Sequence, residues 1–176
     1  MNAKLQRIVT ASMLAAMTTI ATVIIKVPTL GTNGYVNIGD TLVLLCAWLL
    51  GNPYGALAAG IGSALADLLS GYPAYIPGTA AIKFLMAFVA AIIYAGFGRK
   101  NVHNAASYVI SSAAAEIIMI AGYFLYESTI LGYGLAAAAS IGSNAIQGIT
   151  CMVLANALIH VLSGVKFFKD LRAGEK

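Results

Sequence analysis

The chain has 176 residues, of which 60% are hydrophobic and only 9% are charged, and its formal net charge is +4. A water-soluble domain of this length does not need so much apolar surface, so the composition excludes a soluble globular fold and indicates an integral membrane protein. The positive residues lie at the chain ends and in one short loop, which is typical of a membrane topology signal and not of nucleic-acid binding. We expect one membrane domain over residues 1–176.

Six apolar segments follow one another along the chain, at 5–25, 38–50, 55–69, 79–97, 105–126 and 135–162. The first resembles a signal peptide but has no clear cleavage site, so we expect it to be retained. The second and third are short, because a helix rises about 1.5 Å per residue and the hydrocarbon core is about 30 Å thick. They are either spans completed by flanking residues or a re-entrant hairpin. The expected fold is an all-α bundle of six transmembrane helices.

The positive residues indicate how this bundle is oriented. The opposite side has only Lys26, in the loop after the first segment. The positive-inside rule therefore places both termini in the cytoplasm of a prokaryotic cell, in its plasma membrane. The residues on the expected cytoplasmic side are Lys4, Arg7, Arg99, Lys100, Lys166, Lys169, Arg172 and Lys176.

Two opposite charges, Asp67 and Lys83, lie near the same end of the third and fourth segments. An ionisable residue inside a membrane is costly and indicates a functional site. The pair either contacts a ligand or forms a structural ion pair that holds two helices together.

Further polar side chains fall toward the same, outer side of the membrane. Glu116 lies near the middle of its segment and needs a partner, which is a ligand, Lys83 or a proton. Asn144 and Gln147 share one helix face and either bond a neighbouring helix or contact a polar heterocycle. Asp40 stands at a helix start, where a carboxylate favours the positive end of the helix. With the outward tyrosines, these groups predict a pocket open to the outside. Those tyrosines are Tyr35, Tyr72, Tyr75, Tyr123, Tyr126 and Tyr133.

Small residues mark close helix packing. In the third segment Ala56, Gly60 and Ala64 form one column, and a second column lies beside it; we expect both to pack inside the bundle. Ala11 and Ala15 form a similar face on the first segment, which is available to another protein.

Motifs for catalysis and for metal binding are missing. There is no GxxxxGK[ST] loop for ATP and no HExxH or GxSxG motif. Cys46 and Cys151 lie in apolar runs and have neither zinc spacing nor a convincing disulfide partner. We therefore expect no enzyme activity, no cofactor and no metal.

The stretches YVNIGD, AWLLGNPYGALAAGIGSALADLLSGYPAYIPGTAAIK, GYFLYE and NAIQG resemble the substrate-binding (S) components of energy-coupling factor (ECF) vitamin transporters. The resemblance covers the chain from Leu5 to Leu162. It implies a six-helix subunit that binds a water-soluble vitamin from outside. It also implies partners, namely a transmembrane coupling (T) protein and two ABC-type ATPases, and delivery of the ligand by toppling in the bilayer.

The resemblance also suggests roles for particular residues. Ala11 and Ala15 match the family's AxxxA motif, which contacts the coupling protein. The loop 26–37, which ends at Asn37, corresponds to a gate. The implied substrate site uses this loop and the last three helices, with Asp40 and Asp67 as weaker candidates. The full set of candidate site residues is Asn37, Asp40, Asp67, Tyr75, Lys83, Glu116, Tyr123, Asn144 and Gln147.

Such a pocket suits a small hydroxylated heterocycle such as pyridoxine or hydroxymethylpyrimidine, and next riboflavin. Two other classes of function remain open. One is an autonomous facilitator or channel that needs no ATPase. The other is a membrane enzyme acting on lipid with Glu116 as its acid, although a catalyst usually has a second essential group.

Overall fold

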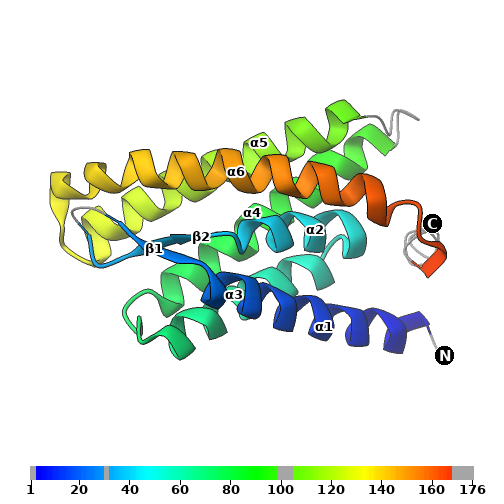
Figure 1. Ribbon diagram of the computed structural model, residues 1–176, viewed down its shortest axis with the longest axis horizontal. Coiled ribbons are helices and arrows are strands. Elements are labelled where there is room, and N and C mark those ends of the chain that lie inside the picture. The colour runs from blue at the N-terminus through cyan, green and yellow to red at the C-terminus, as the bar shows by residue number, and fades with distance from the viewer. Residues whose placement is uncertain (1–2, 30–31, 99–104, 168–176) are drawn as a thin grey trace.

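The computed structural model describes residues 3–29, 32–98 and 105–167 (Figure 1). Six α-helices follow in the expected order, which confirms the all-helical class. Their bounds are Ala3–Ile24 (α1), Asp40–Leu50 (α2), Tyr54–Ser70 (α3), Ile76–Gly98 (α4), Ala105–Leu125 (α5) and Ala139–Leu162 (α6). The positive residues Arg99, Lys100, Lys169, Arg172 and Lys176 lie outside the described residues.

Four of the described helices, α1, α4, α5 and α6, are long and apolar enough to cross a membrane. The helices α2 and α3 have 11 and 17 residues. At about 1.5 Å per residue α2 covers only about half of the hydrocarbon core. The turn between them lies against the middle of α4, because the Asn52 side-chain amide donates a hydrogen bond to the carbonyl of Phe88. The short length expected for these two segments is confirmed.

Four short elements are absent from the sequence prediction. The strands Lys26–Pro28 (β1) and Tyr35–Asn37 (β2) form an antiparallel hairpin between α1 and α2, with Val27 opposite Val36. A π-helical turn, Tyr126–Ile130 (η1), extends α5, and a 3₁₀ turn, Gly134–Ala138 (η2), leads into α6. π-helical turns occur frequently at functional sites. These elements lie together at one end of the bundle (Figure 1).

The short helix α2 forms the centre of the bundle. Ten of its residues are buried, including Trp48, whose indole N–H donates to the hydroxyl of Ser111 on α5. The start of α1 and the end of α6 lie at the same end of the molecule, opposite the hairpin (Figure 1). Because the hairpin reaches α2 from the other end, the residues around Asp40 lie inside the bundle and not at its surface.

Glycines of α3 bring its neighbours close. A Cβ added at Gly62 would lie 2.5 Å from the backbone oxygen of Ala15 on α1, and one at Gly60 would lie 2.9 Å from the backbone oxygen of Ala80 on α4. Backbones in a membrane approach this closely only over small residues. The prediction that the small columns of α3 pack inside the bundle is confirmed.

Candidate ligand-binding site

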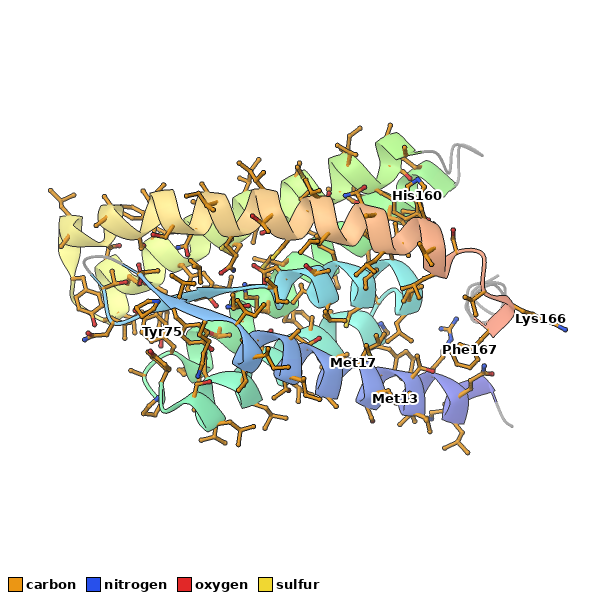
Figure 2. All side chains as sticks on the ribbon, viewed as in Figure 1. Met13, Met17, Tyr75, His160, Lys166 and Phe167 are labelled. Carbon is orange, nitrogen blue, oxygen red and sulfur yellow. The ribbon has the colours of Figure 1, made fainter. Side chains whose placement is uncertain are left out.

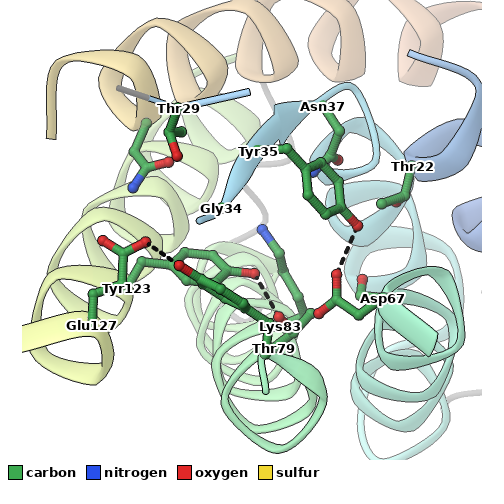
Figure 3. A pocket seen from close by; sticks show the side chains of 13 residues that line it. Thr22, Thr29, Gly34, Tyr35, Asn37, Asp67, Thr79, Lys83, Tyr123 and Glu127 are labelled. Carbon is green, nitrogen blue, oxygen red and sulfur yellow. Dashed lines mark hydrogen bonds between the residues drawn. The ribbon is translucent and has the colours of Figure 1, made fainter. Parts of the chain in front are cut away.

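A cavity lies beneath the β1–β2 hairpin, where α1, α3, α4, α5, η1 and α6 converge (Figure 3). Polar and aromatic side chains dominate its wall. Water-sized molecules have only about 20 Å³ of room in it, which is space for about one water. The cavity is therefore too small for a vitamin-sized molecule in this conformation. The residues that line it are Thr22, Thr29, Gly34, Tyr35, Asn37, Ser63, Asp67, Tyr75, Thr79, Lys83, Tyr123, Glu127 and Asn144.

The floor of the cavity is a buried charge network. The ammonium group of Lys83 on α4 donates a hydrogen bond to Oδ1 of Asp40 at the start of α2. The side-chain amide of Gln147 on α6 donates to Oδ2 of the same carboxylate. Asp40 and Lys83 are 0% and 2% exposed. Three helices are thus joined through one carboxylate.

This network corrects the expected pairing of charges. Lys83 pairs with Asp40 and not with Asp67, although its charge still attracts that of Asp67. Asp40, a weak candidate in the sequence, holds the central position. The reason is the β1–β2 hairpin, which brings the start of α2 down to the level of Lys83 instead of leaving it at the membrane surface.

Asp67 near the end of α3 forms a second cluster, close to the hairpin. Tyr35 on β2 donates its hydroxyl hydrogen to Oδ1 of Asp67, at 2.7 Å (Figure 3). Burial, together with the Asp67 carboxyl, raises the pKa of Tyr35, so the phenol keeps this proton. The Thr79 hydroxyl lies close to Asp67 and bonds the hydroxyl of Tyr123, at 3.1 Å. Oδ2 of Asp67 has no hydrogen-bond partner among the described residues.

Glu127 is a site residue that the sequence reasoning missed. It lies in η1, is 2% exposed and lines the cavity. Its carboxylate accepts hydrogen bonds from Tyr75, at 3.1 Å, and from Ser140, at 2.6 Å. Burial, followed by the charge of Glu127, raises the pKa of Tyr75. The sequence feature that could have identified Glu127 is its position at the end of a long apolar run, before the turn at Gly132 and Gly134.

Glu116 lies deeper, on α5. It is 5% exposed, and neither carboxyl oxygen has a hydrogen-bond partner in the described ranges. Its charge interacts with those of Asp40 and Lys83. Gly148 on α6 makes room for it, because a Cβ there would lie 3.1 Å from the Glu116 Oε2. Glu116 therefore flanks the floor network but does not line the cavity itself.

The structure brings most of the expected site residues together. Six of the nine line the cavity, namely Asn37, Asp67, Tyr75, Lys83, Tyr123 and Asn144. Of the other three, Asp40 and Gln147 form the floor network, and Glu116 flanks it.

The hairpin covers the cavity through a few polar contacts. Besides the Tyr35–Asp67 bond, the Asn37 backbone N–H donates to Oε1 of Gln147, at 2.6 Å. The Asn33 side chain donates to the hydroxyl of Tyr133, at 3.0 Å.

The two small-residue pairs of α1 differ in their exposure. Ala11 and Ala15 are half-buried, and Ala15 lies against Gly62 of α3. The outward face carries Ser12 and Ala16, flanked by Met13 and Met17, which are 61% and 51% exposed (Figure 2). Small residues four apart are thus present on both faces of α1.

Cys46 and Cys151 are both free and buried. Among the residues that the structure describes, no group of three or more His, Cys, Asp or Glu side chains could hold a metal ion.

Six helices, four of them long and apolar enough to cross a membrane, surround a polar cavity at one end of the bundle, which is the architecture of a small helical membrane protein. The sequence model of the family described as "ECF-type riboflavin transporter, S component" matches residues 2–164. The chain belongs to this family: it is an S component of an ECF transporter, a transport subunit of a prokaryotic membrane and not an enzyme. Membership implies a vitamin as substrate and the ECF module as partner.

Two further similarities agree with this assignment. An uncharacterised protein of Pyrococcus woesei is 28% identical over 144 residues, covering 82% of this chain and 93% of the relative. A solved S component of a bacterial ECF transporter has a TM-score of 0.67 and 22% identity, over 92% of this chain and 97% of the other. At this identity the structural likeness shows the fold alone.

Proposed function

We propose that this S component captures one water-soluble vitamin-like heterocycle in the cavity beneath the hairpin and delivers it to the ECF module. The observation that supports this most directly is the concentration of buried polar side chains around one cavity. Buried polar groups are normally hydrogen-bonded, yet Asp67 and Glu116 keep oxygens without partners in the described part of the chain. Of these two residues Asp67 lines the cavity, so its free oxygen is available to a ligand.

The β1–β2 hairpin acts as the gate. Pockets for small molecules have volumes of about 300 Å³ or more, far above the present room of about 20 Å³. The hairpin must therefore move outward to admit a ligand. The few polar contacts that hold it allow this movement without disturbing the helices.

We propose that the substrate is a small heterocycle. Hydroxyl, amide and carboxylate groups line the cavity, which suits pyridoxine or hydroxymethylpyrimidine. Riboflavin is the vitamin in the family's description. Asn144, Lys83 and Tyr123 lie on three different helices and would contact different edges of one ring.

Delivery requires a partner surface, which we place on α1. The coupling protein and two ATPases supply the energy, and the loaded subunit topples in the bilayer against them. Ala11, Ala15 and the more exposed Ser12 and Ala16 supply the small residues for this contact.

Native mass spectrometry of the gently purified chain tests the proposal. We expect one co-purified vitamin-like molecule at a 1:1 ratio. Liposomes with the chain alone should bind this molecule and not accumulate it, whereas liposomes with the ECF module and ATP should accumulate it. Accumulation by the chain alone would instead support an autonomous facilitator.

A further inference from the structure

Buried carboxyl groups outnumber buried ammonium groups around the cavity, among the residues that the structure describes. Every acidic residue in the described part of the chain is buried and lies at or beside the cavity. One buried ammonium group, that of Lys83, faces them. These acidic residues are Asp40, Asp67, Glu116 and Glu127, with exposures of 0%, 3%, 5% and 2%.

Lys83 makes its direct ion pair with the floor of the cavity and not with a carboxyl group of the wall. Its ammonium group is in direct contact with Asp40 and lies 5.1 Å from the centre of the Tyr123 ring. In a buried contact pair, the charge of each group mainly stabilises the opposite charge of its partner. Asp67 and Glu127 on the wall are therefore left without a cation in contact with them in the described ranges.

Asp67 is the wall group with free bonding capacity. Oδ1 accepts the Tyr35 hydroxyl, but the buried Oδ2 has no partner among the residues described. The carboxylate of Glu127 accepts two neutral hydroxyl groups. Leaving a buried carboxylate without a full set of partners costs free energy, and a charged donor satisfies it best.

Tyrosine rings complete the wall. Tyr35, Tyr75 and Tyr123 all line the cavity. Two of these rings already have an ammonium group near them, since Lys26 lies 5.8 Å from the centre of the Tyr35 ring, and Lys83 lies near Tyr123. Aromatic faces attract cations within about 6 Å, and cages of such rings are used to recognise quaternary ammonium ligands.

We infer that the ligand is a positively charged heterocycle, whose protonated amine or cationic ring nitrogen lies between Asp67 and the Tyr35 and Tyr75 rings. This inference rests on the proposed function and narrows its substrate class. An uncharged ring system such as that of riboflavin would leave the Asp67 carboxylate without a cation in contact with it, because Lys83 contacts Asp40 instead. A cationic ligand supplies this contact.

Matched ligand pairs test the inference in isothermal titration of the full chain in nanodiscs at neutral pH. Pyridoxamine and pyridoxine share one ring and differ in an ammonium against a hydroxyl group. Thiamine and hydroxymethylpyrimidine share a pyrimidine and differ in the cationic thiazolium. Riboflavin is the uncharged reference. We expect the cationic member of at least one pair to bind at least about tenfold more tightly than its partner and than riboflavin.

The variant Asp67→Asn then tests the residue. Asparagine keeps an oxygen that can accept the Tyr35 hydroxyl, so the hairpin contact is retained while the charge is lost. We expect the preference for the cation over its neutral partner to fall about tenfold. Glu127→Gln is the second variant and should reduce the same preference, which keeps the test valid if Asp67→Asn fails to fold.

Each outcome decides one claim. A tighter neutral ligand, or a co-purified neutral vitamin, would overturn the inference and leave the proposed function intact. A cation preference that both variants retain would overturn the assignment to these carboxylates. Absence of binding by all five probes, with no co-purified molecule, would overturn both the inference and the proposed function.

Discussion

Lys83 of α4 and Asp40 of α2, 43 residues apart in the chain, form a buried ion pair that Gln147 of α6 completes. The pair lies at the floor of the cavity, which Lys83 lines, and with Gln147 it holds three helices together. We therefore expect stability and ligand affinity to be coupled at this point.

Replacement of Lys83 by Met tests this coupling. Removing one partner of a buried pair leaves an uncompensated charge and costs about 3–5 kcal/mol. We expect a clear loss of thermal stability, followed through the fluorescence of Trp48, and weaker ligand binding. The double variant Lys83→Met, Asp40→Leu should recover much of the stability, because an apolar pair replaces a charged one. A double variant less stable than Lys83→Met would contradict a stabilising pair.

Replacement of Glu116 by Gln separates affinity from stability. The Glu116 oxygens accept no hydrogen bonds in the described part of the chain, and glutamine has nearly the same volume. We expect an unchanged unfolding temperature and a several-fold loss of affinity for the co-purified ligand, measured by titration. Unchanged affinity in both Glu116→Gln and Lys83→Met would remove these residues from the site.

Substitutions on α1 test the partner surface. Ser12→Trp or Ala16→Trp places a bulky group on the exposed face, and we expect loss of ATP-driven uptake with intact ligand binding. Ala15→Leu is the matched comparison on the inner face, where Gly62 leaves no space. It should reduce stability as well as uptake. If the outer variants transport normally while Ala11→Leu abolishes only uptake, the interface lies on the Ala11–Ala15 face instead.

Removal of the Tyr35 hydroxyl tests the gate. A hydrogen bond to a charged group contributes about 1.5–3 kcal/mol, so Tyr35→Phe should speed ligand release by about tenfold or more in stopped-flow measurements. Tyr133→Phe loses only a bond between neutral groups and should have a smaller effect. Equal release rates in wild type and Tyr35→Phe would show that this bond does not restrain the hairpin.

Hydropathy predicted the helices well because it depends only on local sequence. Six apolar segments, the short lengths of α2 and α3 and the clustering of polar residues toward one side all follow from residue order along the chain. Bilayer thickness then limits the fold to helices of known length. For this reason the expected segment bounds lie close to the observed helices.

The sequence by itself therefore determined that the chain is a helical membrane protein with costly polar groups in one half. Only the tertiary structure decided their partners, because contacts depend on the depth and rotation of each helix. The hairpin carries Asp40 inward to Lys83, η1 turns Glu127 toward Tyr75, and Gly62 draws Ala15 into the bundle. These contacts join residues 43 to 52 positions apart, a range over which periodicity and composition give no information.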